Sequence, residues 1–330
     1  MSKWNVVITD YEYPDVEIER EILESAGATV HDYQCRTIED VIEAVGDADV
    51  VINQYALITR EVIESLGRSC VAIGQYGIGV DTIDVAAATE HGIMVINVPS
   101  YCEDEVAEHA IAMMLSLARR IPFYDRDIRQ SIWDYTVEAP IQRVRNRTLG
   151  LIGFGRIARK VAEKVRGFSL QLLAFDPLVD PDVMREAEVH PVPLDELLEN
   201  SDFVSVHVPL NAQTRHLLGE KQLRQLKPTA VLVNVSRGQV VDQKALYRCL
   251  ADHKIRAAGL DVFYEEPPTE KHHGRDLLSL NNAVFSPHVA WYSEESIVDL
   301  RRKLASDVAR VLQGLAPEGL VNAEVRKKGR

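Results

Sequence analysis

The sequence is poor in cysteine and contains no long apolar run. Its four cysteines, Cys35, Cys70, Cys102 and Cys249, show no Cys-x-x-Cys spacing and have no histidines at ligand spacing. A disulfide framework and a metal site are therefore not expected, and the thiols should be reduced. No apolar segment reaches the length that spans a membrane, and the apolar stretch behind the first residues is too short for a signal peptide. We expect a cytoplasmic protein with no membrane partner.

Positive charge is also in short supply. The 37 lysine and arginine residues are outnumbered by 50 aspartate and glutamate residues, which gives a formal net charge of -13. Nucleic acid would be repelled over most of such a surface, so no nucleic-acid partner is expected and the acidity serves solubility. With 330 residues, of which 46% are hydrophobic, the chain is long enough for about two globular domains.

The N-terminal part of the chain contains a regular alternation of short β-branched runs and helical patterns. Strands are expected at residues 6–8, 28–30, 50–52, 71–73 and 94–96, with crossover helices at 17–26, 38–45, 59–66 and 82–91. Because parallel strands need crossover connections, this order predicts a parallel sheet with helices on both faces.

Residues 103–120 interrupt the alternation with one long helix whose apolar residues lie around most of its circumference. Such a helix must be covered on several sides. Acidic residues open it and Arg119 and Arg120 close it, in agreement with the helix macrodipole. It is followed by Pro122 and by the aromatic residues Phe123, Tyr124, Trp133 and Tyr135. We interpret this apolar arm as a domain or subunit contact and expect a homodimer through residues 103–135, although a simple core is equally compatible.

A second alternation begins at Thr148. Strands are expected at residues 149–152, 170–175, 203–208, 230–235, 257–262 and 283–286, and residues 265–275 form a long polar loop. Six parallel strands in this order are what a complete dinucleotide-binding domain requires. The last helix, 296–312, has apolar residues at spacings of three and four and is predicted to return to the first domain. The expected domains are residues 1–101 with 294–330, and residues 102–293.

The first strand of this second series leads into a nucleotide-binding turn. Gly153-x-Gly155-x-x-Ala158 follows the strand directly and opens an amphipathic helix. In this motif the first glycine permits the tight turn, the second lets the backbone approach the pyrophosphate, and the small third residue lets the helix pack on the strand. The amides of Arg156 and Ile157 are expected to point at the phosphates from the start of the helix.

The second strand of this series ends in a carboxylate. Asp176 lies 21 residues after Gly155 (176 − 155 = 21), close to the usual spacing for the acid that binds the ribose hydroxyls. A carboxylate repels a 2′-phosphate, and Pro177 and Leu178 follow it where an arginine would favour NADP. The sequence therefore predicts NAD as the coenzyme, with a plain turn aspartate as the structural alternative.

Three polar residues follow later strands of the same series. Arg237 comes after the strand 230–235, Glu266 after 257–262 and His288 after 283–286. Because the carboxyl ends of parallel strands meet at one edge of a sheet, a guanidinium, a carboxylate and an imidazole are expected together there. Such a set beside a dinucleotide indicates an oxidoreductase acting on a keto or hydroxy acid. Taken one at a time, each residue also fits a structural role.

The segments around these residues resemble the D-isomer-specific 2-hydroxyacid dehydrogenases. They are Asn234–Gly238, Gly259–Pro267 and Ser286–His288, together with Gly77–Asp84 in the first domain. The resemblance extends over nearly the whole chain. It implies an α/β fold of two doubly wound parallel-sheet domains, a Rossmann NAD domain and a flavodoxin-like substrate domain, with an active-site cleft between them. It also implies NAD-dependent hydride transfer between nicotinamide C4 and the C2 carbon of a small 2-keto or 2-hydroxy acid.

The resemblance assigns roles to the three residues. Arg237 matches the family's substrate-binding arginine, whose planar fork suits a carboxylate and the carbonyl oxygen where negative charge develops. His288 matches the general acid and base, which protonates that oxygen during reduction and takes the proton back during oxidation. Glu266 matches the acid that pairs with this histidine, orients it and favours its charged form.

Further contacts are implied by position. The turn formed by Tyr76, Gly77, Ile78 and Gly79 matches the family's backbone-amide cradle for the substrate carboxylate. The residues expected against the coenzyme, besides the glycine turn and Asp176, are Val106, Val208, Pro209, Thr214, Val235, Ser236 and Asp261. Turn geometry without function and apolar strand ends remain structural alternatives at these positions.

The segment after His288 resembles the C-terminal-binding-protein branch of the family. It reads Val289-Ala290-Trp291-Tyr292-Ser293-Glu294-Glu295, and the branch carries a tryptophan at this place. Trp291 would then form a wall of the substrate pocket and favour an apolar or thioether side chain, with inter-domain packing as its rival role. The chain departs from the branch at Gln75, where an arginine is typical.

Two alternative functions are carried forward. Phosphoglycerate dehydrogenase is one, but its substrate phosphate needs cations, and the loops at residues 53–56 and 75–76 contain none, apart from Arg60 further along the chain. An NAD(H)-sensing corepressor or scaffold is the other, because eukaryotic members of the branch have that function. Long regulatory tails are expected in that class, and this chain ends in a short basic segment at residues 326–330. We therefore favour the enzyme.

Overall fold

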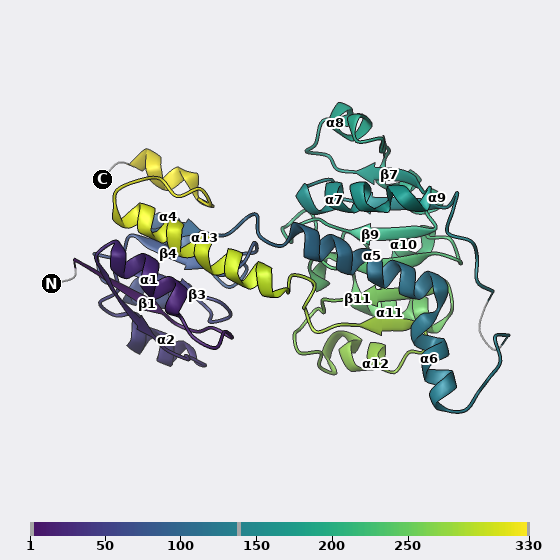
Figure 1. Cartoon of the computed structure of the whole chain (residues 1–330), viewed down its shortest axis with the longest axis horizontal. Coiled ribbons are helices and arrows are strands. Elements are labelled where there is room, and N and C mark those ends of the chain that lie inside the picture. Colours follow the sequence, from purple (N-terminus) through teal and green to yellow (C-terminus); the bar gives the residue numbers. More distant parts are fainter. Residues whose placement is uncertain (1–2, 137–139, 329–330) are drawn as a thin grey trace. The chain divides into compact units, whose positions relative to one another are not determined.

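The computed structural model describes residues 3–136 and 140–328. The chain divides into two compact units, unit 1 (Met1–Tyr101 with Ser293–Arg330) and unit 2 (Cys102–Tyr292). In Figure 1, the long C-terminal helix α13 (Glu294–Leu312, yellow-green) lies against helix α1 (Glu17–Ser25, purple), so the two ends of the chain both contribute to unit 1. Among the described residues, no helix is both long enough and apolar enough to cross a bilayer.

Unit 1 is built on a five-stranded parallel sheet in the order β2-β1-β3-β4-β5. Its strands are β1 (Trp4–Ile8), β2 (Ala28–Asp32), β3 (Val50–Asn53), β4 (Ala72–Gln75) and β5 (Met94–Ile96). All five strands expected from the sequence are present. The order is that of flavodoxin-like doubly wound sheets, which confirms this part of the predicted fold.

Helices cover both faces of the sheet in unit 1. Besides α1 and α13 they are α2 (Ile38–Val45), α3 (Arg60–Ser65), α4 (Val85–Glu90) and the short 3-10 helix η4 (Ala323–Lys328). Leu300, Leu304 and Val308 of α13 pack with Leu23 of α1 in the core on one face, and α2, α3 and α4 bury their apolar residues on the other. The apolar residues of α13 thus pack in a core, as their spacing of three and four residues predicts.

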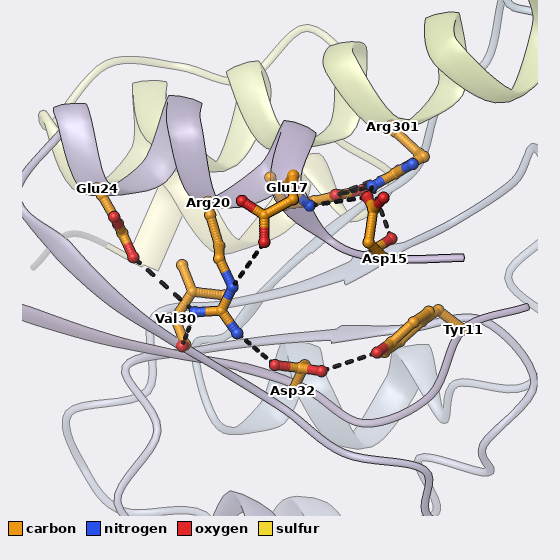
Figure 2. A network of polar contacts seen from close by, with 9 residues as sticks. Tyr11, Asp15, Glu17, Arg20, Glu24, Val30, Asp32 and Arg301 are labelled. Atoms are coloured by element: carbon orange, nitrogen blue, oxygen red, sulfur yellow. Dashed lines mark hydrogen bonds and ion pairs between the residues drawn. The ribbon is translucent and has the colours of Figure 1, made fainter. Parts of the chain in front are cut away.

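Two arginines bind the helices of unit 1 to neighbouring elements. Figure 2 shows Arg20 of α1 directed at Asp32 at the end of β2. In the same view Arg301 of α13 donates to Asp15, just before α1, at 3.1 Å. Arg301 also donates to the fully buried carboxylate of Glu19 at 2.8 Å. A buried carboxylate without a partner is costly, so this pair fixes α1 against α13.

Unit 2 contains a seven-stranded parallel sheet in the order β12-β11-β10-β9-β6-β7-β8. Its strands are β6 (Thr148–Ile152), β7 (Gln171–Phe175), β8 (His190–Pro191), β9 (Phe203–Val206), β10 (Val231–Asn234), β11 (Ala257–Leu260) and β12 (Ala283–Phe285). The sequence predicted six of these. The seventh, β8, has 2 residues and pairs only with β7, which is too short a run to show a strand pattern.

The helices of unit 2 lie on both faces of its sheet. They are α5 (Glu103–Arg119), α6 (Ile121–Arg129), α7 (Arg156–Lys164), α8 (Pro181–Glu186), α9 (Leu194–Asn200), α10 (Glu220–Gln225), α11 (Gln243–Ala251) and α12 (Gly274–Leu278), with 3-10 turns η1 (Val165–Phe168), η2 (Gly238–Val240) and η3 (Lys271–His273). Helix α5 packs on α7, β10 and β11. The stretch 265–275, expected to be a loop, is partly helical because η3 and the start of α12 lie in it.

Helix α5 is covered on one side. Its buried residues are Val106, Ala107, Ala110, Met113, Met114, Leu117 and Ala118, which share a face. Ile111 and Leu115 are half-buried and Ala112 is exposed. The all-round cover expected for this helix is therefore not supplied by the described residues of unit 2.

Candidate active site

The three catalytic candidates of unit 2 lie in loops at one edge of its sheet. Arg237 follows β10, Glu266 comes after β11 and His288 comes after β12. These three strands are consecutive neighbours. Because they run parallel, their carboxyl ends lie side by side. The sheet thus brings the three loops to the same edge.

His288 and Glu266 form a hydrogen-bonded pair. The distance between Nδ1 of His288 and Oε2 of Glu266 is 2.6 Å. The other carboxylate oxygen, Oε1, accepts the N–H of Phe263 at 2.9 Å. A carboxylate can only accept, so Nδ1 carries the hydrogen and Nε2 is the ring nitrogen left for exchanging a proton. The two side chains are 38% and 37% exposed, which leaves the pair accessible.

The backbone of His288 is held in a left-handed conformation with φ 53°. Its N–H donates to the carbonyl of Asp261 at 2.8 Å, and its carbonyl accepts the indole N–H of Trp291 at 3.0 Å. Left-handed backbone is uncommon for a residue with a side chain, so these bonds explain how the turn is kept. Trp291 is expected at the substrate pocket, and in the structure its indole N–H stabilises this turn.

Asp261 is the buried centre of the same turn, with 1% of its surface exposed. Oδ1 accepts the N–H of Val289 and Oδ2 accepts the N–H of Ala290, both at 2.9 Å. The hydroxyl of Ser286 donates to Oδ1 at 2.5 Å. The resemblance assigns Asp261 to the coenzyme, whereas in the structure both of its carboxylate oxygens bind groups of the chain itself.

Arg237 belongs to a turn fixed by residues that sequence reasoning did not single out. Asn234 donates from Nδ2 to the carbonyl of Arg237 at 3.0 Å. Gly238 lies so close to the next loop that a Cβ there would be 1.9 Å from the carbonyl oxygen of Phe263, and therefore only glycine fits. Since Phe263 also holds Glu266, the loops of Arg237 and Glu266 are fixed against each other. In the sequence, an asparagine two residues before Ser-Arg-Gly could have indicated this hydrogen-bonded turn.

The glycine turn has the geometry that a dinucleotide requires. Gly153 has φ +90°, and a Cβ there would lie 2.9 Å from both the carbonyl oxygen of His207 and Cγ1 of Val208. Gly155 is the N-cap of α7, and a Cβ there would meet nothing within 4 Å. The first glycine is thus needed by the fold, and the second leaves open space in front of the backbone, where a pyrophosphate can approach.

The start of α7 can hold an anion. Among the described residues, no side chain of the N-cap position caps this helix. The N–H groups in the first turn of an α-helix point out of its N-terminus. Helix N-termini of this kind bind phosphate through their N–H groups and dipole. Ala158 is fully buried, which keeps the helix close to the sheet. These residues fit the pyrophosphate of NAD.

Asp176 lies beside the glycine turn at the end of β7. Its Oδ2 accepts the N–H of Phe154 at 2.8 Å, and its Oδ1 accepts the N–H of Leu178 at 2.9 Å. The first bond links the carboxylate to the residue between the two glycines. The acid is therefore fixed at the turn, where the ribose of a bound dinucleotide would lie.

His207 was missed by sequence reasoning although it touches the glycine turn through its carbonyl. Its Nε2 lies 2.8 Å from the hydroxyl of Ser205, and its Nδ1 is buried without a hydrogen-bond partner among the described residues. Burial lowers the pKa of His207 to about 4, so the ring is neutral at physiological pH. Its position at the end of an apolar strand does not indicate that its ring is desolvated.

The remaining residues expected against the coenzyme lie at strand ends, in loops or on α5. Val106 and Val235 are buried, Val208 is half-buried and Pro209 is exposed. The hydroxyl of Thr214 donates to the carbonyl of Pro209 at 2.6 Å, and that of Ser236 donates to Asn234 at 2.9 Å. Both hydroxyls thus close local turns.

The predicted carboxylate cradle lies at the end of β4 in unit 1. Tyr76 is buried, and its hydroxyl donates to Glu19 at 2.9 Å. Burial raises the pKa of this phenol well above its usual value, so it stays protonated as a donor. Gly77 and Gly79 are half-buried, and Ile78 is exposed. The polar atom of Tyr76 is therefore engaged inside unit 1, and the carbonyls of Gly77 and Ile78 accept hydrogen bonds from Val98 and Asn97.

The cysteines show no sign of special chemistry. Cys70, Cys102 and Cys249 are buried, Cys35 is half-buried, and none of the four takes part in a disulfide bond. Within residues 3–136 and 140–328, no group of three histidine, cysteine or acidic side chains is arranged to hold a metal ion.

Comparison with known proteins identifies the family. Residues 111–290 match the family described as "D-isomer specific 2-hydroxyacid dehydrogenase, NAD binding domain". The chain belongs to the D-isomer-specific 2-hydroxyacid dehydrogenases. It is 41% identical to a glyoxylate reductase of Korarchaeum cryptofilum, over 87% of this chain and 86% of that one. It is 38% identical to a D-3-phosphoglycerate dehydrogenase of Methanocaldococcus jannaschii, over 87% of this chain and 54% of that one.

Solved structures agree with this assignment. A glyoxylate reductase from Paecilomyes thermophila is 28% identical, with a TM-score of 0.88 over 98% of this chain and 100% of that one. A D-lactate dehydrogenase from Aquifex aeolicus, complexed with NAD and lactic acid, is 28% identical, with a TM-score of 0.86 over 94% of this chain and 96% of that one. The predicted family, its two parallel-sheet domains, NAD as coenzyme and oxidoreductase activity on CH–OH groups are confirmed. The C-terminal-binding-protein branch stays a prediction.

Proposed function

We propose that the protein is a 2-keto acid reductase in which His288 is the acid and base, Glu266 orients it and Arg237 binds the substrate. Bound NADH supplies the hydride for C2 of the keto acid. The observation that carries this proposal is the 2.6 Å contact between Nδ1 of His288 and Glu266, because it leaves Nε2 as the proton-exchanging atom on an accessible ring.

Each residue of the pair has a defined part in the reaction. In reduction, the imidazolium of His288 donates its Nε2 proton to the carbonyl oxygen of the keto acid. In oxidation, the neutral ring takes the proton back from the hydroxyl. Glu266 fixes the tautomer through Nδ1 and stabilises the imidazolium by its negative charge. The guanidinium of Arg237 binds the substrate carboxylate and the oxygen on which charge develops.

NAD is expected at the glycine turn of unit 2. The start of α7 would bind the pyrophosphate, and Asp176 would accept the ribose hydroxyls and exclude a 2′-phosphate. The loop residues Val208, Pro209 and Thr214, with Val106, Val235, Ser236 and Asp261, are proposed to surround the nicotinamide and adenosine halves. This assigns NAD binding to residues 102–293.

Residues 1–101 with 294–330 are proposed as the substrate-binding domain. The backbone amides of Gly77, Ile78 and Gly79 would hold the substrate carboxylate, while Tyr76 fixes the turn from inside. Trp291 would border the substrate side chain. The proteins with related sequences include several named glyoxylate reductase, so glyoxylate is our first candidate among small 2-keto acids. The loops at residues 53–56 and 75–76 offer no cation for a phosphorylated substrate.

A homodimer through residues 103–135 is proposed on the exposure of the arm. Trp133 is 89% exposed and Tyr135 is 84% exposed. Exposed large apolar side chains that follow a helix with an uncovered side are typical of a subunit contact. The molar mass in solution tests this proposal, since Trp133→Ser should weaken the dimer and a parent that is monomeric at micromolar concentration would refute it. A cytoplasmic location stays a prediction.

A substrate screen tests the proposed activity. The purified protein is mixed with NADH and, separately, with glyoxylate, pyruvate, phenylpyruvate, 4-methylthio-2-oxobutyrate and 3-phosphohydroxypyruvate, and NADH oxidation is followed by absorbance. We expect turnover with at least one unphosphorylated acid, none with His288→Gln, and weaker activity with NADPH. If no acid is reduced while NADH still binds, the corepressor or scaffold function is favoured instead. Preference for 3-phosphohydroxypyruvate would indicate phosphoglycerate dehydrogenase.

A further inference from the structure

A histidine on α5 is joined to the turn that carries His288. Nε2 of His109 lies 2.8 Å from the hydroxyl oxygen of Ser286 at the end of β12, and 3.7 Å from Oδ1 of Asp261. The His109 side chain is 27% exposed and that of Asp261 is fully buried. We propose that His109 is a positioning residue, which holds the His288 turn in its working orientation through Ser286 and Asp261.

The direction of the hydrogen bonds follows from counting protons. The hydroxyl of Ser286 has one hydrogen, and the carboxylate of Asp261 at 2.5 Å can only accept it. The bond between Ser286 and His109 must therefore be donated by Nε2 of His109. The chain of donors runs from His109 to Ser286 to Asp261, so the imidazole must carry a hydrogen on Nε2 in the assembled network.

Asp261 links Ser286 to the backbone of the His288 turn. Its backbone carbonyl accepts the N–H of His288 at 2.8 Å. Its carboxylate accepts the next two N–H groups, those of Val289 and Ala290. Asp261 thus holds the backbone of the His288 turn, so a rotation of its carboxylate would move the turn. The bond from Ser286 limits this rotation, and His109 in turn fixes Ser286.

The turn needs such a restraint because it begins at an edge strand. β12 has 3 residues and pairs with β11 alone. In contrast, α5 is a helix of 17 residues that packs on β10, β11 and α7. The contact from His109 therefore attaches a short edge strand of the sheet to a long helix that packs on the sheet, 177 residues away in sequence.

The inference rests on the proposed function of His288, and kinetics can separate the two. We expect His109→Leu to lower the single-turnover rate of glyoxylate reduction about tenfold, since small misplacements of a catalytic group cost large factors. Affinity for NADH, measured by fluorescence, should stay within about twofold, because the proposed pyrophosphate and ribose contacts follow β6 and β7 and do not depend on the carboxylate of Asp261. The solvent deuterium isotope effect on the single-turnover rate should rise, because proton transfer from a loosened His288 becomes slower.

A conservative variant of His109 and a double variant with Ser286 make the test more specific. His109→Gln retains a side-chain N–H donor and should recover most of the rate. Ser286→Ala should resemble His109→Leu, and the double variant should lose no more than either one, as expected for residues acting in one network. Glu108→Gln, at the exposed neighbouring position on α5, is the matched control and should behave like the parent.

The outcomes distinguish the two claims. If His288→Gln abolishes reduction while His109→Leu keeps the parental rate and isotope effect, this inference is overturned and the proposed function stands. If His109→Leu loses rate and NADH affinity together and His109→Gln does not restore them, the residue is merely structural, and the inference is again overturned. If His288→Gln stays active, the proposed function fails and this inference fails with it.

Discussion

The carboxyl edges of the two sheets use their polar residues in opposite ways. At the edge of unit 1, Tyr76 donates to Glu19, and the side chains of Glu19 and Arg301 are 0% and 6% exposed. At the edge of unit 2, His288 and Glu266 are also paired, but their side chains are 38% and 37% exposed. Both units are parallel doubly wound sheets, so the fold class alone does not decide what an edge does.

The difference indicates that the first edge contributes to stability and the second to activity. The buried pair of unit 1 is out of reach of a ligand, since its side chains are 0% and 6% exposed, and it accepts the hydroxyl of Tyr76 beside the proposed cradle at Gly77. The accessible pair of unit 2 fixes one atom of the imidazole and leaves the other ring nitrogen for a proton. Substitutions should therefore cost stability at the first edge and activity at the second.

The largest expected effect is a loss of activity from the accessible pair. His288→Gln should lower kcat/KM for keto acid reduction by about 10²–10⁴-fold, because general acid catalysis is lost. The free energy of unfolding should hardly change, since the side chain is more than a third exposed. Initial rates and urea unfolding, measured on the same preparation, check both parts. A variant that unfolds early yet turns over normally would reverse the comparison.

The corresponding change in unit 1 should act on folding. Arg301→Met leaves the carboxylate of Glu19 buried without its partner, and breaking a buried ion pair in this way costs about 3–5 kcal/mol of unfolding free energy. Urea unfolding measures this loss. Arg302→Met, at the exposed adjacent position of α13, is the control and should cost little. Equal losses in the two variants would show that the pair does not stabilise unit 1.

His207 tests whether unit 2 also contains a polar side chain that contributes to stability rather than to activity. In the folded chain its pKa is about 4, against an ordinary value of 6.5. Between these values the unfolded chain binds the additional proton, so the stability supplied by the neutral ring is complete above about pH 6.5 and falls as the pH falls toward about 4.

The sensitivity to acid should therefore depend on this residue. Between about pH 7 and about pH 4.5, the parent should lose about 1–3 kcal/mol more unfolding free energy than His207→Gln does. Urea unfolding of both proteins at the two pH values gives the comparison. Identical losses would mean that the surroundings of His207 do not lower its pKa.

The smallest expected effect concerns the choice of coenzyme. Asp176→Ser removes the charge that would repel a 2′-phosphate, so the preference for NADH over NADPH should fall about tenfold, which corresponds to about 1.4 kcal/mol. The ratio of kcat/KM for the two coenzymes measures it. Asp182→Ser removes an exposed acid on α8 and should leave the ratio unchanged. An unchanged ratio in Asp176→Ser would place the ribose elsewhere.

Much of this arrangement could be predicted from the sequence, because it depends on local patterns. The alternation of short apolar runs predicts two parallel sheets, and the polar residues behind the last three strands indicate one edge. The glycine turn and Asp176 have a fixed spacing. These features require only that parallel strands share a direction.

The rest depends on tertiary contacts that no local pattern contains. The two residues of β8 are too few to show a period. Nothing near His109 indicates that α5 crosses the sheet where its ring meets Ser286. The direction of the Tyr76 hydroxyl, toward Glu19, follows from the packing of α1 and α13. The pairing of β8 with β7, the contact of His109 with Ser286 and the packing of α1 against α13 are all properties of the folded chain.

The most direct test of the central claim concerns Arg237. Arg237→Ala should reduce glyoxylate reduction at least about 10²-fold, because the guanidinium proposed to bind the substrate carboxylate and the developing charge is lost. Affinity for NADH, measured by fluorescence titration, should be retained. Arg237→Lys should recover only part of the rate, since an ammonium lacks the bidentate fork. Parental turnover in Arg237→Ala would contradict the account and remove the catalytic role from this edge of the sheet.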